Sequence, residues 1–245
     1  MLEGRYEFKF PVVGADRTAI VAGGREALRE DPHGTQAVYR VASLYFDSPD
    51  RLAYREKRDG EYRRRKFRLR WYPSPSVEGV AAAFFEIKHR IDQRVAKERI
   101  GLAPEGAVAI LEDPQGELPR LEEHALRGER LRAASSIAAV LRQAQLQRLE
   151  PVTVISYVRE AWMGALDSRL RLTFDSACQA YRPEAWRQAA LDQGASILAP
   201  ERLIMEVKFD RRLARWLRDL VTDRGLLQRR FSKYAAGVEV LRQAR

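Results

Sequence analysis

The segment EYRRRKFRLRWY, residues 61–72, constrains the fold more than any other part of this chain, because charged and apolar side chains alternate along it. In a β-strand, successive side chains point to opposite faces of the sheet. One face of this predicted strand therefore carries four cations, Arg64, Lys66, Arg68 and Arg70. The other face carries Arg65 with the apolar residues Phe67, Leu69 and Trp71, and it needs a covering layer.

The same alternation predicts strands in seven other segments, residues 5–10, 37–48, 83–90, 92–100, 153–162, 168–175 and 201–210. Helices are predicted at residues 16–30, in a helical insertion at about 103–147, and at the C-terminus in 211–245. In an ordinary half-exposed sheet the charged faces would point to water. The amphipathic helices instead favour an α+β fold, in which they cover the apolar faces and the strands close into an antiparallel β-barrel with a charged lumen. We expect a single domain over residues 1–245.

A cationic lumen is tolerable only if its charges are solvated, paired or bound to an anion, because like charges repel strongly at low dielectric. The formal net charge of +10 and the isoelectric point near 10.0 agree with an anionic partner. Nucleic acid is not expected, since the cations alternate onto one face of each strand and do not form an open surface interleaved with aromatic residues.

The rest of the composition excludes several classes of protein. The only cysteine is Cys178, so an intramolecular disulfide framework is excluded, and no Cys/His cluster has zinc-site spacing. The N-terminal segment MLEGRYEFKF lacks the apolar stretch of a secretory signal, and no apolar run approaches the length of a membrane span. We expect a cytoplasmic protein. The helix-then-loop segment at residues 183–200 has no predicted role.

The chain resembles the VTC domain, the polyphosphate polymerase domain of the vacuolar transporter chaperone complex, within the triphosphate tunnel metalloenzyme (CYTH-like) superfamily. The resemblance follows an ordered series of segments along nearly the whole chain. They are YEFKF, SLYFDS, RLRWY, FEIKHR, VAKER, SYVREAW, RLTFD, MEVKF and FSKYAAGVEVL. It implies an eight-stranded antiparallel tunnel that binds a nucleoside triphosphate or polyphosphate with Mn²⁺ or Mg²⁺, and a membrane-protein partner is possible.

Carried over residue by residue, the resemblance implies phosphate-binding and catalytic roles for Lys9, Arg68, Arg70, Lys88, Lys97, Arg159, Arg171 and Lys233. It implies substrate-binding roles for Arg99, Tyr157, Lys208 and Ser232. Glu206 resembles the metal ligand of the family, and Glu86 and Glu7 are weaker candidates. Phosphoryl transfer needs positioning and charge neutralisation more than covalent chemistry, which agrees with such a set. The alternative for Glu206 is a structural ion pair with a neighbouring cation.

One position departs from the pattern of the hydrolytic members, which begin with ExExK. Arg5 stands where the first glutamate would be, ahead of Glu7 and Lys9. This loss weakens the case for two-metal hydrolysis and favours an ATP-polyphosphate phosphotransferase, a polyphosphate polymerase. The alternative for Arg5 is a pair with a nearby acid at the tunnel mouth. The alternative functions are a triphosphatase of the same fold and a non-catalytic module that binds polyphosphate or inositol phosphates.

Overall fold

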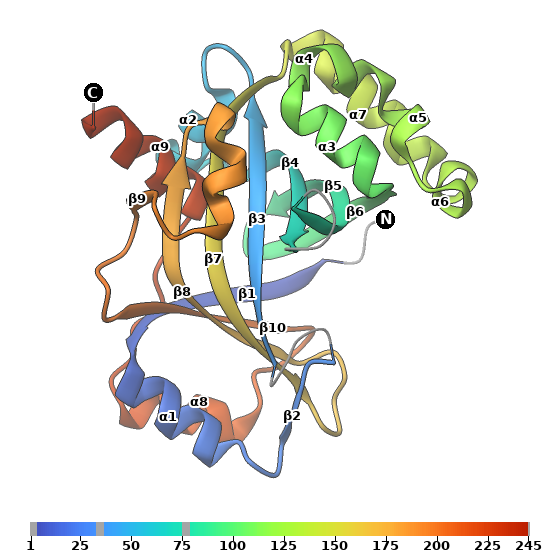
Figure 1. Ribbon diagram of the computed structural model, residues 1–245. Coiled ribbons are helices and arrows are strands. Elements are labelled where there is room, and N and C mark those ends of the chain that lie inside the picture. Colours follow the sequence, from blue (N-terminus) through green and yellow to red (C-terminus); the bar gives the residue numbers. More distant parts are fainter. Residues whose placement is uncertain (1–3, 33–36, 75–78, 245) are drawn as a thin grey trace.

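Eight long antiparallel strands form the centre of the molecule. The computed structural model describes residues 4–32, 37–74 and 79–244. The strands lie in the order β7, β3, β4, β5, β6, β1, β10, β8, and the sheet closes in a ring because β7 also pairs with β8 (Figure 1). Their bounds are β1 Arg5–Val13, β3 Val38–Asp47, β4 Arg63–Pro73, β5 Val80–Ile91, β6 Arg94–Leu102, β7 Glu150–Gly164, β8 Arg171–Tyr181 and β10 Arg202–Phe209. Each predicted strand corresponds to one of these eight, so the expected fold class is confirmed.

Helices cover much of the outer surface of the ring. The segment predicted to be a helical insertion forms α3 (Pro104–Glu112), α4 (Pro114–Glu117), α5 (Leu121–His124), α6 (Arg127–Arg132) and α7 (Ala134–Gln147), with a 3₁₀ turn at Leu118–Arg120. These helices bury the apolar face of β4, where Phe67, Leu69 and Trp71 join one core with Ile110 and Ile137. Arg65 lies on the same outer side and is exposed. The outward direction expected for this face of β4 is therefore confirmed.

The segment at residues 183–200 covers another part of this outer core. It contains a 3₁₀ segment, Pro183–Ala190, followed by the two-residue strand β9, Ala195–Ser196. Trp186 packs edge-on against Trp71, with ring centroids 6.1 Å apart. The segment thus helps to bury the apolar side of β4.

A second helical layer lies below the ring in the view of Figure 1. Helices α1 (Gly14–Gly23) and α8 (Arg215–Asp223) lie side by side and cover the apolar faces of β1, β8 and β10. The helix predicted at residues 16–30 is wrong in both bounds. The helix begins at Gly14, and Asp16 lies in its first turn, where its carboxylate accepts a hydrogen bond from the backbone of the N-cap residue Val13 at 3.1 Å. Residues 28–30 form the short strand β2 (Leu28–Glu30). Gly23 and Gly24 end the helix where the chain passes close to α8.

Helix α9 (Lys233–Gln243) lies differently, against side chains of the inner face of the ring. Gly237 allows this close approach, since a Cβ there would lie 2.4 Å from Ile155 Cδ1. Helix α2 (Leu52–Asp59) packs beside α9 and ends at Gly60, whose φ of 80° favours glycine. Ser232 and Lys233, at the N-terminus of α9, line the ring interior, where the helix dipole adds to the positive potential.

Candidate functional site in the ring interior

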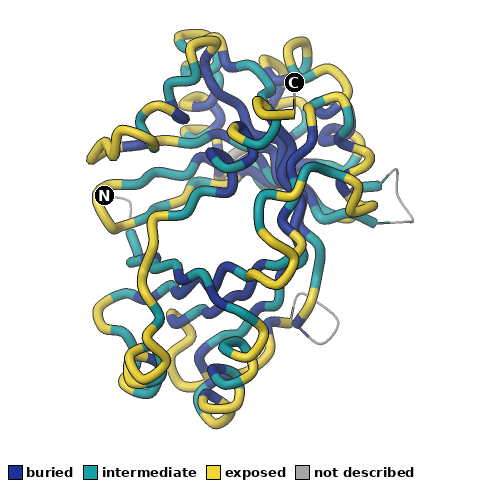
Figure 2. The backbone as a smooth tube through the Cα atoms, turned by 90° about the vertical axis from the view of Figure 1, so that its left-hand side faces the viewer, coloured by how far each residue is buried: buried dark blue, intermediate teal, exposed yellow. Residues whose placement is uncertain are grey.

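The ring encloses a cavity of about 350 Å³. Figure 2 shows the backbone running around this central region, with helices above and below it. The cavity is lined by thirteen lysines and arginines but by only two acids, Glu7 and Glu206, among the described residues. The cations are Arg5, Lys9, Lys57, Arg64, Lys66, Arg68, Arg70, Lys88, Arg90, Lys97, Arg159, Lys208 and Lys233. Such a lining suits a polyanion with many charged oxygens.

Strand periodicity explains how most of these cations reach the cavity. In β4 and β5, side chains two residues apart share a face, and antiparallel register places them opposite one another. Arg64 lies opposite Arg90, and Lys66 lies opposite Lys88. One charged sequence pattern therefore gives two directly opposed pairs of like charges inside the ring.

Glu206, on β10, is surrounded by four of the cations. Its carboxylate lies 3.0 Å from Lys9 Nζ, 3.2 Å from Lys233 Nζ, 3.5 Å from Lys208 Nζ and 3.6 Å from Arg159 Nη2. Burial alone would raise the pKa of Glu206, but the lysines outweigh burial and hold that pKa well below its ordinary value. Glu206 is therefore ionised at neutral pH and connects strands β1, β7 and β10 with α9.

Glu7 forms a second acidic centre on the same side of the cavity. Lys88 Nζ donates hydrogen bonds to both carboxylate oxygens of Glu7, at 2.9 Å each. Lys9 Nζ lies 3.6 Å and Lys208 Nζ 3.8 Å from the same carboxylate. Burial opposes ionisation of Glu7, but these lysines lower its pKa below the ordinary value. Since Glu7 and Glu206 share Lys9 and Lys208, the two carboxylates act as one charged unit.

Glu86 lies behind the cavity lining and is fully buried. Its carboxylate is 2.6 Å from Arg68, 2.9 Å from Lys97, 3.2 Å from Arg99 and 3.8 Å from Arg70. Arg68 also donates to the Tyr45 hydroxyl at 2.9 Å, and Arg70 to that of Tyr157 at 3.0 Å. Glu86 thereby fixes in position two arginines of β4 that line the cavity.

Asp175 is a site residue that the sequence analysis did not assign. It is fully buried on β8 and accepts two hydrogen bonds from Arg159, at 2.7 and 2.8 Å, and one from Lys233. Asp175 lies on the same predicted strand face as Arg171, and that periodicity was the only available signal.

Ser232 caps α9 by accepting a hydrogen bond from the Ala235 backbone, and its hydroxyl also accepts one from Lys66 Nζ at 2.7 Å.

The structure brings together twelve of the fifteen residues assigned from the sequence as lining residues of this cavity. They are Lys9, Arg68, Arg70, Lys88, Lys97, Arg159, Lys233, Tyr157, Lys208, Ser232, Glu206 and Glu7. The three others are Glu86, behind the lining, Arg99 and Arg171. Arg99 lies over the ring of Phe84, with 4.3 Å from its guanidinium carbon to the ring centroid, and contacts Glu86.

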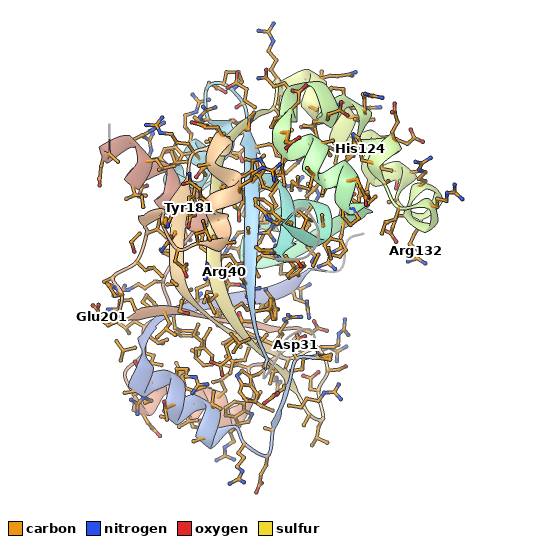
Figure 3. The ribbon with its side chains drawn as sticks, in the orientation of Figure 1. Asp31, Arg40, His124, Arg132, Tyr181 and Glu201 are labelled. Carbon is orange, nitrogen blue, oxygen red and sulfur yellow. The ribbon has the colours of Figure 1, made fainter. Side chains whose placement is uncertain are left out.

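Arg171 lies away from the central cavity. Its guanidinium is 2.7 Å from the carboxylate of Asp31 and donates to the Tyr39 hydroxyl at 3.0 Å. Figure 3 shows Asp31 near the lower ends of the long strands. Arg171 therefore has an ion pair at the edge of the ring, a contact that strand periodicity does not reveal.

Arg5 lines the cavity, and its guanidinium donates a hydrogen bond to the Arg169 carbonyl at 3.3 Å. The partner shown is thus a backbone oxygen and not the acid considered from the sequence. Several lining residues were given no functional role from the sequence: Lys57, Arg64, Lys66, Arg90, Tyr45, Phe231 and Tyr234. Periodicity along β4 already placed Arg64 and Lys66 on the charged face, whereas Lys57 belongs to a helix and gave no signal.

The VTC domain family profile matches residues 4–242, which is nearly the whole chain. The chain belongs to the VTC domain family. A search of curated proteins found no match. The match to the family profile confirms the family expected from the sequence.

The solved structures that align with most of this VTC domain share little sequence identity with it. A Bacillus halodurans protein provisionally named as an adenylate cyclase is 13% identical, with 92% of this chain and 91% of that chain covered and a TM-score of 0.49. The PH1819 protein of Pyrococcus horikoshii is 12% identical, with coverages of 98% and 99% and a TM-score of 0.45. The Mimivirus capping enzyme triphosphatase is 7% identical, with coverages of 90% and 86% and a TM-score of 0.36. Because these TM-scores lie below 0.5, the family assignment depends on the VTC match alone.

The acids of this VTC domain do not form a complete metal cage. Within the described part of the chain, no group of three or more His, Cys, Asp or Glu residues is arranged to hold a metal ion. Glu7 and Glu206 nevertheless face the cavity together. Mg²⁺ is commonly held by one or two carboxylates plus substrate phosphates. The pair therefore fits a hard divalent cation that shares its coordination with phosphate oxygens. Among the described residues, no helix is long and apolar enough to cross a membrane.

Proposed function

We propose that this VTC domain is a metal-dependent polyphosphate polymerase. The observation that supports the proposal is the composition of the cavity lining, which among the described residues has thirteen cations, the two acids Glu7 and Glu206, and neither histidine nor cysteine. The Ser232 hydroxyl in the lining accepts hydrogen bonds from Lys66 and from the backbone of Ala235 and has no described histidine beside it as a base, and direct transfer between phosphates needs no enzyme nucleophile. The anionic substrates would be ATP and a polyphosphate chain.

The proposed reaction is a direct transfer of the γ-phosphoryl group of ATP. A terminal oxygen of the phosphate chain attacks the γ-phosphorus, and the bond from that phosphorus to the β,γ-bridging oxygen breaks. The electron pair leaves with ADP, and the chain grows by one phosphate. Developing charge on the equatorial oxygens requires donors that are already in position.

The positions of the arginines suggest how the chain would hold these oxygens. Arg68 and Arg159 are each fixed by a buried carboxylate, Glu86 and Asp175 respectively. Guanidinium groups stay charged at any accessible pH and bind phosphate oxygens in pairs. Lys9 and Lys233 would neutralise further oxygens beside Glu206. A Mn²⁺ or Mg²⁺ ion bound at Glu206 and Glu7 would add charge neutralisation across neighbouring phosphates.

The test is to incubate the purified protein with ATP and Mn²⁺ and to separate the products by gel electrophoresis and phosphate assay. Long polyphosphate that forms only with the divalent metal supports the polymerase. Release of orthophosphate without chain product would instead identify a triphosphatase, in which water is the acceptor. Binding of ATP or polyphosphate without turnover would identify a non-catalytic module. The cytoplasmic location and the membrane-protein partner stay predictions.

A further inference from the structure

The acids are unevenly distributed among the cations of the ring. The cations around Glu7, Glu86, Asp175 and Glu206 all have carboxylate partners. At the start of β4 and the end of β5, Arg64 lies opposite Arg90 and Lys66 opposite Lys88. Like charges placed directly opposite each other in a sheet are destabilising. Lys88 is paired with Glu7, but among the described residues Arg64, Lys66 and Arg90 have no ion pair with a carboxylate, so the folded chain offsets the electrostatic cost of this end of the cavity only in part.

Arg64 gives the clearest sign of a missing partner. The residue is 8% exposed and lines the cavity, yet its Nη1 atom is buried and has no hydrogen-bond partner. A buried guanidinium donor without an acceptor costs free energy. Burial lowers the pKa of Arg64, and Arg90 and Arg230 lower it further, while the weaker effects of Glu56 and Asp92 oppose them.

Lys66 and Lys57 extend this acid-poor end of the cavity. Lys66 Nζ donates to the Ser232 hydroxyl at 2.7 Å, a neutral partner, and burial with the neighbouring lysines holds the pKa of Lys66 well below its ordinary value. Burial, then Arg64, Arg230 and Arg90, also lower the pKa of Lys57, with Glu239 opposing weakly. We call Lys57, Arg64, Lys66 and Arg90 the acid-poor cluster.

We propose that the acid-poor cluster binds the internal phosphates of a linear phosphate chain, next to the acid-containing part of the cavity where transfer would take place. Every internal phosphate of such a chain carries a negative charge and no bulky side group. It can therefore enter a ring whose cavity is about 350 Å³ and place oxygens against four cations at once. The inference rests on the proposed function, because it assigns the chain, and not ATP, to this end.

The experiment measures binding without ATP and without metal, by isothermal titration calorimetry with long-chain polyphosphate and with tripolyphosphate. Arg64→Gln and Lys66→Gln are compared with Arg65→Gln, the neighbouring arginine on the outer face. We expect Arg64→Gln to weaken long-chain binding by about tenfold, the loss typical of one charge-assisted contact, and to change tripolyphosphate binding much less. Arg65→Gln should leave both unchanged.

Stability supplies a second readout. Since Arg64 faces Arg90, Arg64→Gln should keep or raise the melting temperature of the free protein while long-chain affinity falls, and Lys66→Gln provides the same test if Arg64→Gln does not fold. Equal losses for both probes, no loss in either variant, or an equal loss in Arg65→Gln would overturn the proposal. Binding of a single-stranded oligonucleotide with the same dependence on Arg64 would overturn it in favour of nucleic acid. A wild-type protein that makes no polyphosphate from ATP refutes the polymerase but leaves this binding test intact.

Discussion

Lys9 of β1 and Glu206 of β10 are directly opposed in neighbouring antiparallel strands, with Lys9 Nζ 3.0 Å from the Glu206 carboxylate. This pair joins the two strands at the cavity. Every cation around Glu206 also has a second acidic partner: Lys9 and Lys208 contact Glu7, whereas Arg159 and Lys233 contact Asp175. The ion pairs around Glu206 are thus redundant, and Glu206 can be altered without leaving any of these four cations without a carboxylate partner.

Glu206→Gln tests the metal role of Glu206 on this basis. We expect the variant to fold, to lose metal-dependent turnover, and to bind tripolyphosphate without metal at least as well as wild type, because a negative charge has left an anion site. Turnover across a Mn²⁺ titration, with metal-free calorimetry, measures both effects. Near wild-type activity at limiting Mn²⁺ would show that Glu206 is only a structural partner of the lysines.

Arg68→Ala and Arg65→Ala form a matched pair on one strand. Arg68 lines the cavity, and its removal should weaken binding of a non-hydrolysable ATP analogue by about tenfold or more, since a charge-assisted contact contributes about 1.5–3 kcal/mol. In Arg68→Ala, Glu86 would still form ion pairs with Arg70, Lys97 and Arg99, so the variant should fold.

Arg65 is exposed outside the ring, and Arg65→Ala should change the melting temperature slightly through lost packing of its aliphatic stem. Its affinity for the analogue should equal that of wild type. Equal losses of affinity in the two variants would mean that the charge acts as a diffuse surface, contrary to an inward-facing site.

The pH dependence of phosphate binding should depend on Lys208. Burial lowers the pKa of Lys208 to about 7, although Glu206 and Glu7 oppose the shift, while Arg159 and Lys88 add to it. The lysine attracts phosphate only when protonated, so its contribution is present below this pKa and is lost as the pH rises through it. Bound phosphate should raise the pKa and cause proton uptake in weakly alkaline buffer.

Lys208→Arg provides the control, because arginine stays charged. We expect equal tripolyphosphate affinities in mildly acidic buffer, and an advantage for the variant approaching tenfold about one pH unit above the lysine pKa. Calorimetry in buffers of different ionisation enthalpy counts the protons taken up. A constant ratio of the two affinities across this pH range would contradict the assignment.

Asp175→Asn should destabilise the fold strongly. Asp175 is fully buried and accepts from both Arg159 and Lys233, and removal of one partner from a buried ion pair typically costs about 3–5 kcal/mol. Chemical denaturation measures the change. Glu112→Gln, which removes an exposed ion pair with Arg187, should change stability little. A similarly small loss for Asp175→Asn would show that Glu206 replaces Asp175 as the partner of these cations.

The sequence by itself determined the eight strands, the face of each strand that carries charge, and the family. These features follow from local geometry, because alternation of side chains fixes the face of every residue in a strand. It placed Lys9, Arg68 and Arg159 on the charged faces of their strands, and it placed Arg64 by the same rule.

Only the tertiary structure decided where along the ring each inward residue lies and which partner it meets. Register and strand order set that position, and neither is encoded in a single strand's period. Arg171 and Arg159 occupy similar sequence patterns, yet Arg171 pairs with Asp31 at the edge while Arg159 pairs with Asp175 beside Glu206. The uneven distribution of acids, which leaves Arg64 Nη1 without an acceptor, likewise arises only when eight distant segments close around one cavity.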